Sequence, residues 1–96
     1  MEVVWSNSAK DELKKLFAYI ALDSLKNAEI VRDTLIGLTI EIANNPESHS
    51  LDKFKNENDG SWRAFEKFRY RISYRVTKTQ IQIVRLRHTS KSPIDY

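Results

Sequence analysis

Residues 62–88 read WRAFEKFRYRISYRVTKTQIQIVRLRH, and this stretch decides how the rest of the chain can fold. Within it, Tyr70, Ile72, Tyr74 and Val76 alternate with Arg69, Arg71, Ser73 and Arg75. Alternation with a period of two is typical of a strand that has one apolar face and one solvent-facing face. We therefore expect a sheet with one basic face, in which Tyr74 points into the core and Arg75 points away from it.

Charge divides the chain into two parts. Residues 62–91 carry nine lysines and arginines and a single acid, Glu66, whereas residues 1–61 carry seven lysines and arginines and eleven acids. The net charge of +3 conceals this division. A basic sheet face indicates an anionic partner, either a nucleic acid or an acidic protein.

Length and composition limit the remaining possibilities. The 96 residues predict one small domain with a single core, spanning residues 1–96. Because the chain has no cysteine and shows no metal-ligand pattern or phosphate-binding glycine loop, we expect neither a metal nor a cofactor. No apolar run approaches the roughly 20 residues of a membrane span, and the first residues do not resemble a signal peptide. We therefore expect a cytoplasmic protein without membrane contact.

The acidic front half predicts a short strand and two helices. Residues 2–5 are β-prone, and apolar residues then recur at helical spacing. We place one helix at residues 8–22, beginning at Ser8, and a second at residues 25–44, beginning at Ser24. The second helix is apolar on more than one side, so we expect it to lie between the sheet and either the first helix or a partner.

A long polar connection, residues 46–61, joins the helices to the basic block, and we expect Leu51 and Phe54 to attach it to the body of the domain. The basic block divides into three strands, at residues 62–68, 70–77 and 80–87. In the last strand the apolar phase shifts at Val84, which indicates either a bulge or a strand covered on both faces. The predicted fold is α+β in two layers, with an N-terminal strand, a helical hairpin and a three-stranded antiparallel meander.

This order of elements resembles the RelE/ParE superfamily of toxins from bacterial type II toxin–antitoxin modules. The resemblance rests on VVWSNSAKDELKKLFAYIA (residues 3–21), on the helix ending at NNPES (residues 44–48), and on YRISYRVTKTQIQIVRLRHTS (residues 70–90). It covers nearly the whole chain and implies a RelE-like fold, a role in plasmid stabilisation and a cognate acidic antitoxin that forms a hetero-oligomer with the toxin. RelE-like members cut mRNA in the ribosomal A site, whereas ParE-like members poison DNA gyrase.

The RelE-like activity needs a base, an acid and cations that stabilise charge on the phosphate. The resemblance implies that Arg63, His88 and Tyr96 are catalytic and act together on one phosphate. The basic pattern and the resemblance together predict nucleic-acid contacts by Lys53, Lys55, Arg69, Arg71, Arg75, Arg87 and Lys91. The chain departs from relatives that end in His-Tyr, because Thr89 follows His88.

Three functions stay open on these residues. The first is a metal-independent, ribosome-dependent mRNA endoribonuclease, the second a gyrase inhibitor without catalysis, and the third an antitoxin-binding module that has lost its catalysis. His88, Tyr96 and the pair Lys53 and Lys55 favour the first. Each residue also has a structural explanation, since His88 can be a surface histidine, Tyr96 a frayed end, and the arginines a solvated sheet face.

Overall fold

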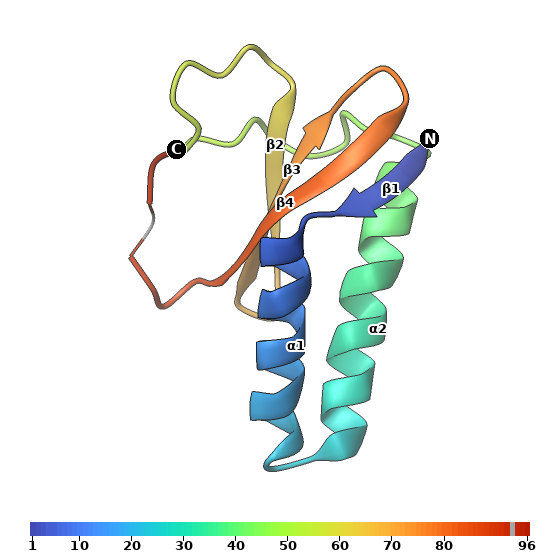
Figure 1. The fold of residues 1–96 in the computed structure, drawn as a ribbon, viewed down its shortest axis with the longest axis vertical. Helices are drawn as coiled ribbons and strands as arrows, with labels where there is room; N and C mark the ends of the chain where they lie inside the picture. The colour runs from blue at the N-terminus through green and yellow to red at the C-terminus, as the bar shows by residue number, and fades with distance from the viewer. Residues whose placement is uncertain (93) are drawn as a thin grey trace.

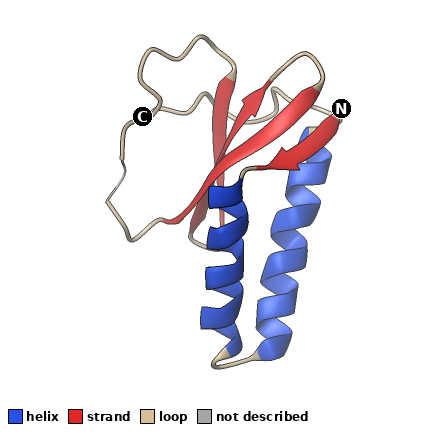
Figure 2. Cartoon of the chain, viewed as in Figure 1, coloured by secondary structure: helices blue, strands red, loops and turns tan. Residues whose placement is uncertain are grey.

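The computed structural model describes residues 1–92 and 94–96, and its elements follow the predicted order (Figure 1). They are strand β1 (Glu2–Trp5), helices α1 (Asn7–Ala21) and α2 (Leu25–Ile42), and strands β2 (Trp62–Lys67), β3 (Tyr70–Val76) and β4 (Gln80–His88). Figure 2 shows the two helices side by side, with the turn between them extending well beyond the sheet. The α+β fold with an N-terminal strand, a helical hairpin and an antiparallel meander is confirmed.

The four strands form one sheet in the order β1-β4-β3-β2. The last three are antiparallel neighbours, whereas β1 pairs in parallel with β4, from Glu2 opposite Gln80 to Trp5 opposite Ile83. Parallel neighbours need a long connection between them. Here that connection contains both helices and the other two strands, so the first and last elements lie side by side.

The phase shift in the last strand is a bulge. Tyr74 lies opposite Ile83, while the residue before Tyr74 lies opposite Arg85, so Val84 is an extra residue in β4. The extra residue turns the strand by one position. It therefore keeps Leu86 on the same buried side as Ile83, although the sequence alternation alone would separate them.

The core lies between the helical hairpin and the sheet. Its buried residues are Ala9, Leu16, Leu35, Ile42, Phe65, Ile72, Tyr74, Ile81, Ile83 and Leu86. Tyr74 is fully buried, as predicted, and its hydroxyl donates to the carbonyl oxygen of Pro46 at 2.9 Å. The wide apolar surface of α2 is only partly covered, since the side chains of Ile30 and Ile40 are exposed to solvent.

Helix α1 begins earlier than predicted because Ser6, not Ser8, is its N-cap. The Ser6 hydroxyl oxygen accepts the N–H of Ala9 at 3.0 Å, and the same hydroxyl donates to the carbonyl of Val84 at 3.1 Å. The cap therefore fixes the start of the helix to the bulge in β4. The hydrogen bond from Ser6 to Val84 joins residues far apart in the sequence, so the local sequence does not reveal it. It favours Ser6 as the N-cap, and Ser8 therefore lies inside the helix.

Helix α2 begins where predicted, with Ser24 accepting the N–H of Asn27 at 3.1 Å, but it ends at Ile42 rather than at residue 44. The strands deviate from the predicted bounds by one residue, and a two-residue turn separates β2 from β3.

Candidate anion-binding site on the outer sheet face

The outer face of the sheet, which lies away from the helices, carries three of the predicted basic residues, Arg71, Arg75 and Arg87, together with Arg85. Residues directly opposite each other in neighbouring strands point to the same face of a sheet. By this register the outer face includes Trp62, Ala64 and Glu66 of β2, Arg71, Ser73 and Arg75 of β3, and Arg85 and Arg87 of β4. The predicted alternation is therefore confirmed for residues 70–76, whereas Arg69 lies in the turn before the strand.

The connection of residues 46–61 covers part of this outer face, and it is anchored by Asp52. Asp52 is 2% exposed. The backbone N–H of Asp52 donates to the carbonyl of Trp62 at 2.9 Å, and its side-chain Oδ1 accepts the N–H of Phe54 at 3.1 Å. Leu51 attaches to the sheet by its backbone, in a β-bridge with Arg63, whereas its side chain is 50% exposed and does not act as the predicted apolar anchor. The hydrogen-bonded Asp52 attaches the connection to the sheet instead, and a sequence pattern of apolar anchors does not identify it.

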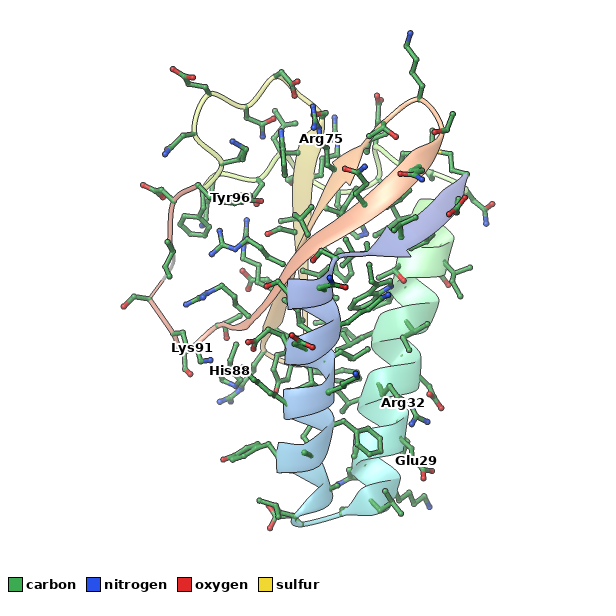
Figure 3. All side chains as sticks on the ribbon, in the orientation of Figure 1. Glu29, Arg32, Arg75, His88, Lys91 and Tyr96 are labelled. Atoms are coloured by element: carbon green, nitrogen blue, oxygen red, sulfur yellow. The ribbon has the colours of Figure 1, made fainter. Side chains whose placement is uncertain are left out.

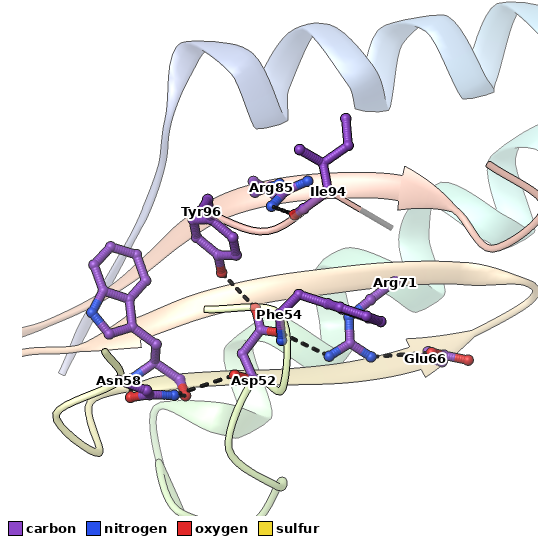
Figure 4. Close-up of polar contacts among 9 residues, drawn as sticks. Asp52, Phe54, Asn58, Glu66, Arg71, Arg85, Ile94 and Tyr96 are labelled. Carbon is purple, nitrogen blue, oxygen red and sulfur yellow. Dashed lines mark hydrogen bonds and ion pairs between the residues drawn. The ribbon is translucent and has the colours of Figure 1, made fainter. Parts of the chain in front are cut away.

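Arg71 connects Asp52 to the sheet. Its Nη2 lies 2.9 Å from Oδ1 of Asp52, and its Nη1 lies 3.1 Å from Oε2 of Glu66 (Figure 4). The guanidinium carbon also lies 4.8 Å from the centre of the Phe54 ring. The Arg71 side chain, predicted to bind nucleic acid, is thus held by two carboxylates and an aromatic ring, and its charge is balanced within the protein.

Tyr96 completes this network from the other end of the chain. Its hydroxyl donates to Oδ2 of Asp52 at 2.5 Å (Figure 4). Its backbone N–H donates to the carbonyl of Phe54 at 3.0 Å, and its carbonyl accepts the N–H of Asn56 at 2.6 Å. The Arg85 guanidinium lies 4.3 Å from the centre of its ring. We call residues 89–92 and 94–96 the tail, and Tyr96 fixes its end to the connection.

The same contacts determine the acid–base behaviour of Tyr96. Burial, followed by the hydrogen bond to Asp52, raises the pKa of the Tyr96 hydroxyl to about 12. A hydroxyl with that pKa keeps its proton at neutral pH and donates a hydrogen bond to the carboxylate. In this arrangement Tyr96 does not have the properties of a general base.

Asp52 shows the opposite balance. Burial alone would raise the pKa of its carboxyl, but hydrogen bonds from Tyr96, Arg71 and the backbone N–H of Phe54 outweigh burial and lower the pKa overall. Asp52 is therefore ionised at neutral pH, and it is the buried charge that holds the connection, the sheet and the tail together.

A hollow of about 250 Å³ lies on the outer face beside this network. We call it the basic pocket. Its cationic lining consists of Lys53, Arg71, Arg85, Arg87 and Lys91, and its other lining residues include Glu66, Ser73, Phe54, His88, Ile94 and Tyr96. Sheet, connection and tail thus each contribute a wall, and cations outnumber carboxylates.

Arg63 does not lie on this face. It is opposite Tyr74, so its side chain points to the helix-facing side, where its Nη1 donates to the carbonyl of His49 at 2.7 Å. Tyr96, by contrast, packs its ring on Trp62 of the outer face, with the ring centres 5.7 Å apart. The prediction that Arg63 and Tyr96 converge with His88 on one phosphate is therefore wrong in its geometry. Convergence with Tyr96 requires Arg63 on the outer face, whereas the register of β2 turns it to the helix-facing side.

His88 lies at the end of β4, opposite Tyr70, with the two ring centres 5.1 Å apart. Its Nδ1 accepts the backbone N–H of Ser90 at 3.0 Å and lies 2.6 Å from the Ser90 hydroxyl. The residue borders the basic pocket, but these contacts also stabilise the turn into the tail. Figure 3 shows His88 and Lys91 close together at this end, apart from Tyr96.

The other residues predicted to contact nucleic acid lie in three different places: the basic pocket, the turn between β2 and β3, and the surface around Trp62. Arg87 and Lys91 line the basic pocket with Lys53, whereas Arg69 is exposed in the turn between β2 and β3. Lys55 and Arg75 both lie over the ring of Trp62, with Lys55 Nζ 4.9 Å and the Arg75 guanidinium carbon 5.0 Å from its centre. These roles in nucleic-acid binding stay predictions.

Sequence reasoning missed Asp52 and Asn58. The Asn58 side-chain amide donates to the carbonyl of Trp62 at 2.8 Å, and its oxygen accepts the N–H of Gly60 at 2.8 Å. The Asn-Asp-Gly sequence at residues 58–60 was a usable turn signal for Asn58. For Asp52, no local pattern marks one acid among several as the buried one.

Comparison with known proteins identifies the family. A family model described as the ParE toxin of the type II toxin–antitoxin system parDE matches residues 3–93. The chain belongs to the ParE toxin family. This confirms the predicted membership of the RelE/ParE superfamily.

This ParE-family chain also has the fold of a solved structure. A chain from the structure titled "Chromosomal ParDE TA system from P. aeruginosa" superposes with a TM-score of 0.70 at 16% sequence identity. The match covers 92% of this chain and 95% of the other, so it supports the fold. A search of curated proteins gave no match. No helix in residues 1–92 and 94–96 is long and apolar enough to span a membrane.

Proposed function

We propose that this chain is the toxin of a type II toxin–antitoxin pair, and that it inhibits DNA gyrase by binding rather than by a chemical reaction. Membership of the ParE family supports this choice over the RelE-like endoribonuclease. The contacts of Tyr96 are the observation that carries it, because they remove one of the two residues, Tyr96 and His88, that could exchange a proton at the candidate site.

The nuclease interpretation needs a base, an acid and free cations around one phosphate. The Tyr96 hydroxyl donates a hydrogen bond to Asp52, and its pKa is raised to about 12, so it keeps its proton at neutral pH. Arg63 lies on the other side of the sheet, and Arg71 is paired with two carboxylates. These positions favour a stable binding surface over a catalytic group.

A cognate antitoxin is the second part of the proposal. Nine cations and one acid in residues 62–91 make an acidic partner the best match to this half of the chain. An acidic segment that becomes ordered on binding could cover such a surface and block access to the target. The toxin and its antitoxin would then form a hetero-oligomer.

The test compares the two targets directly. Purified toxin is added to gyrase with relaxed plasmid and ATP, and the supercoiled product is measured. In parallel, toxin is added to a translation extract, and primer extension maps any mRNA cleavage. We expect supercoiling to fall with rising toxin concentration, recovery when the antitoxin is added, and intact mRNA.

Tyr96→Phe is the matched variant for this test, because it removes only the hydroxyl. It should still inhibit gyrase, since the ring and backbone contacts of Tyr96 remain. Ribosome-dependent mRNA cutting that disappears in Tyr96→Phe, together with unaffected gyrase, would reject the proposal in favour of the nuclease.

A further inference from the structure

The basic pocket has more positive charge than the protein itself balances. Five cations line it: Lys53, Arg71, Arg85, Arg87 and Lys91. The carboxylates of Asp52 and Glu66 both bind Arg71. Among the described residues, the other four cations have no carboxylate partner within 4 Å. The unbalanced positive charge of the pocket therefore favours an anion that carries more than one negative charge.

The number and type of these cations favour phosphate over carboxylate. A carboxylate carries one charge, whereas a phosphate ester carries about 1.5 to 2 negative charges at pH 7 and three acceptor oxygens. Arg85 already donates to the Ile94 carbonyl and lies over the Tyr96 ring, whereas Arg87 has a planar guanidinium group that can donate two parallel hydrogen bonds to phosphate oxygens. The lysines at positions 53 and 91 add charge from the connection and the tail.

The tail limits the size of the ligand. At one end, the N–H of Thr89 donates to the carbonyl of Arg69 at 2.8 Å. At the other end, Arg85 donates to the carbonyl of Ile94 at 2.8 Å, and Tyr96 is held by Asp52. The tail is therefore attached at both of its ends, each beside the pocket.

The volume agrees with a small ligand. About 250 Å³ is slightly smaller than the roughly 300–1,000 Å³ common for small-molecule sites. This space suits a phosphate group with one attached sugar or base, not a run of nucleotides. The rings of Phe54 and Tyr96 already contact cations, so recognition would depend on the phosphate more than on stacking of a base.

We propose that the basic pocket binds one compact phosphate-bearing molecule of about nucleotide size, held mainly by Arg87 and Lys91, with the attached tail excluding a continuous nucleic-acid strand. This site is additional to the gyrase interaction and does not depend on it. Its ligand would be a free nucleotide or the terminal phosphate of a nucleic acid, which share the same phosphate chemistry.

The test is an NMR titration of the isotopically labelled protein with pyrophosphate, with ADP and with a 5′-phosphorylated single-stranded 12-mer. Pyrophosphate and ADP should give saturable shifts in β4 and the tail. The Arg87→Ala, Lys91→Ala double variant should bind about tenfold more weakly, because two charge-assisted contacts are lost. Arg87→Lys keeps the charge but loses the planar fork, and should show a smaller loss.

The control is the Lys10→Ala, Lys14→Ala double variant, which removes equal charge from exposed positions of α1. It should bind pyrophosphate as the wild type does. Equal weakening in both double variants, or shifts that never saturate, would overturn the proposal in favour of general electrostatic attraction. Tighter binding of the 12-mer than of ADP, with shifts along the whole outer face, would overturn the size limit. A 12-mer that shifts only the pocket residues would instead identify a terminal phosphate as the ligand.

Discussion

Asp52 is the residue on which the outer face depends. It lies among polar neighbours in a loop, yet it accepts hydrogen bonds from Phe54, Arg71 and Tyr96. Removing one partner from a buried ion pair is costly because the other charge is left without compensation. The stability of the connection and the tail should therefore vary with the ionisation of this one carboxyl group.

Asp52→Asn tests this at neutral and acidic pH. The pKa of Asp52 is lowered by folding, so its contribution is present above the unfolded-state pKa of about 4 and is lost as the pH falls through the folded-state value. We expect the variant to lose about 1–3 kcal/mol at pH 7, with a smaller difference from wild type below about pH 4. Chemical denaturation at several pH values measures this.

Asp33→Asn is the matched control, because Asp33 pairs with Arg32 at the surface and its side chain is 67% exposed. Its stability should stay within about 0.5 kcal/mol of wild type. If the two variants behaved alike, Asp52 would be no more than an ordinary surface acid.

At the scale of elements, the turn between β2 and β3 departs from ordinary turn chemistry. Phe68 and Arg69 both have positive φ, 52° and 65°. Two-residue hairpin turns with this geometry strongly prefer Asn-Gly, because residues with larger side chains are strained there. The pairing of β2 with β3 therefore maintains the hairpin register, while the strained turn lowers the stability of the hairpin slightly.

Replacing Phe68 by Asn and Arg69 by Gly should relieve this strain. We expect the double variant to gain about 1 kcal/mol, which for a domain of this size raises Tm by about 4–8 °C. Arg69→Ala alone removes the same charge but retains the strain, and it should leave Tm nearly unchanged. A lower Tm in the double variant would mean that the Phe68 ring, 42% exposed, contributes more by packing than the turn costs.

At the scale of the whole molecule, two different layers protect the sheet. The helical hairpin covers its inner face with apolar side chains, whereas the connection and the tail cover its outer face by polar contacts. Apolar layers of this kind make up the core, and loop layers open more easily. The outer layer should therefore be able to open while the inner layer stays folded.

Deleting residues 94–96 tests whether the layers are independent. The deletion removes the hydrogen bonds of Tyr96 to Asp52, Phe54 and Asn56. Hydrogen exchange should accelerate by about tenfold or more across residues 52–58, since those contacts close the connection, while α1 and α2 keep their protection. Faster exchange throughout both helices would show instead that the two layers unfold together.

Local patterns were sufficient for much of this fold. The alternation around Tyr74 identified the inner and outer faces of β3, and Ser24 marked the start of α2, because both features depend on neighbouring residues. The parallel partner of β1 had no local signal. In β2, Trp62 and Phe65 are both large and apolar but face opposite sides, so the phase was ambiguous and Arg63 was misplaced.

The candidate site was less predictable than the fold. The basic character of the outer face followed from composition, but the link between Asp52 and Tyr96 joins residues 44 positions apart. Such a pair depends on how the connection and the tail meet, which periodicity does not describe. Predicting the residue types of the site was therefore possible, whereas predicting which cations were already neutralised was not.

The pairing of β1 with β4 has a consequence for the order in which a newly made chain can fold. Glu2–Trp5 is made before the other described elements, yet its only partner strand among the described residues, Gln80–His88, is made after all of them. The helical hairpin can form early from local contacts, while the sheet waits for this distant pairing. Chains interrupted before β4 would leave Val3 and Trp5 without partners, so truncated products should be unfolded and harmless rather than partly active toxins.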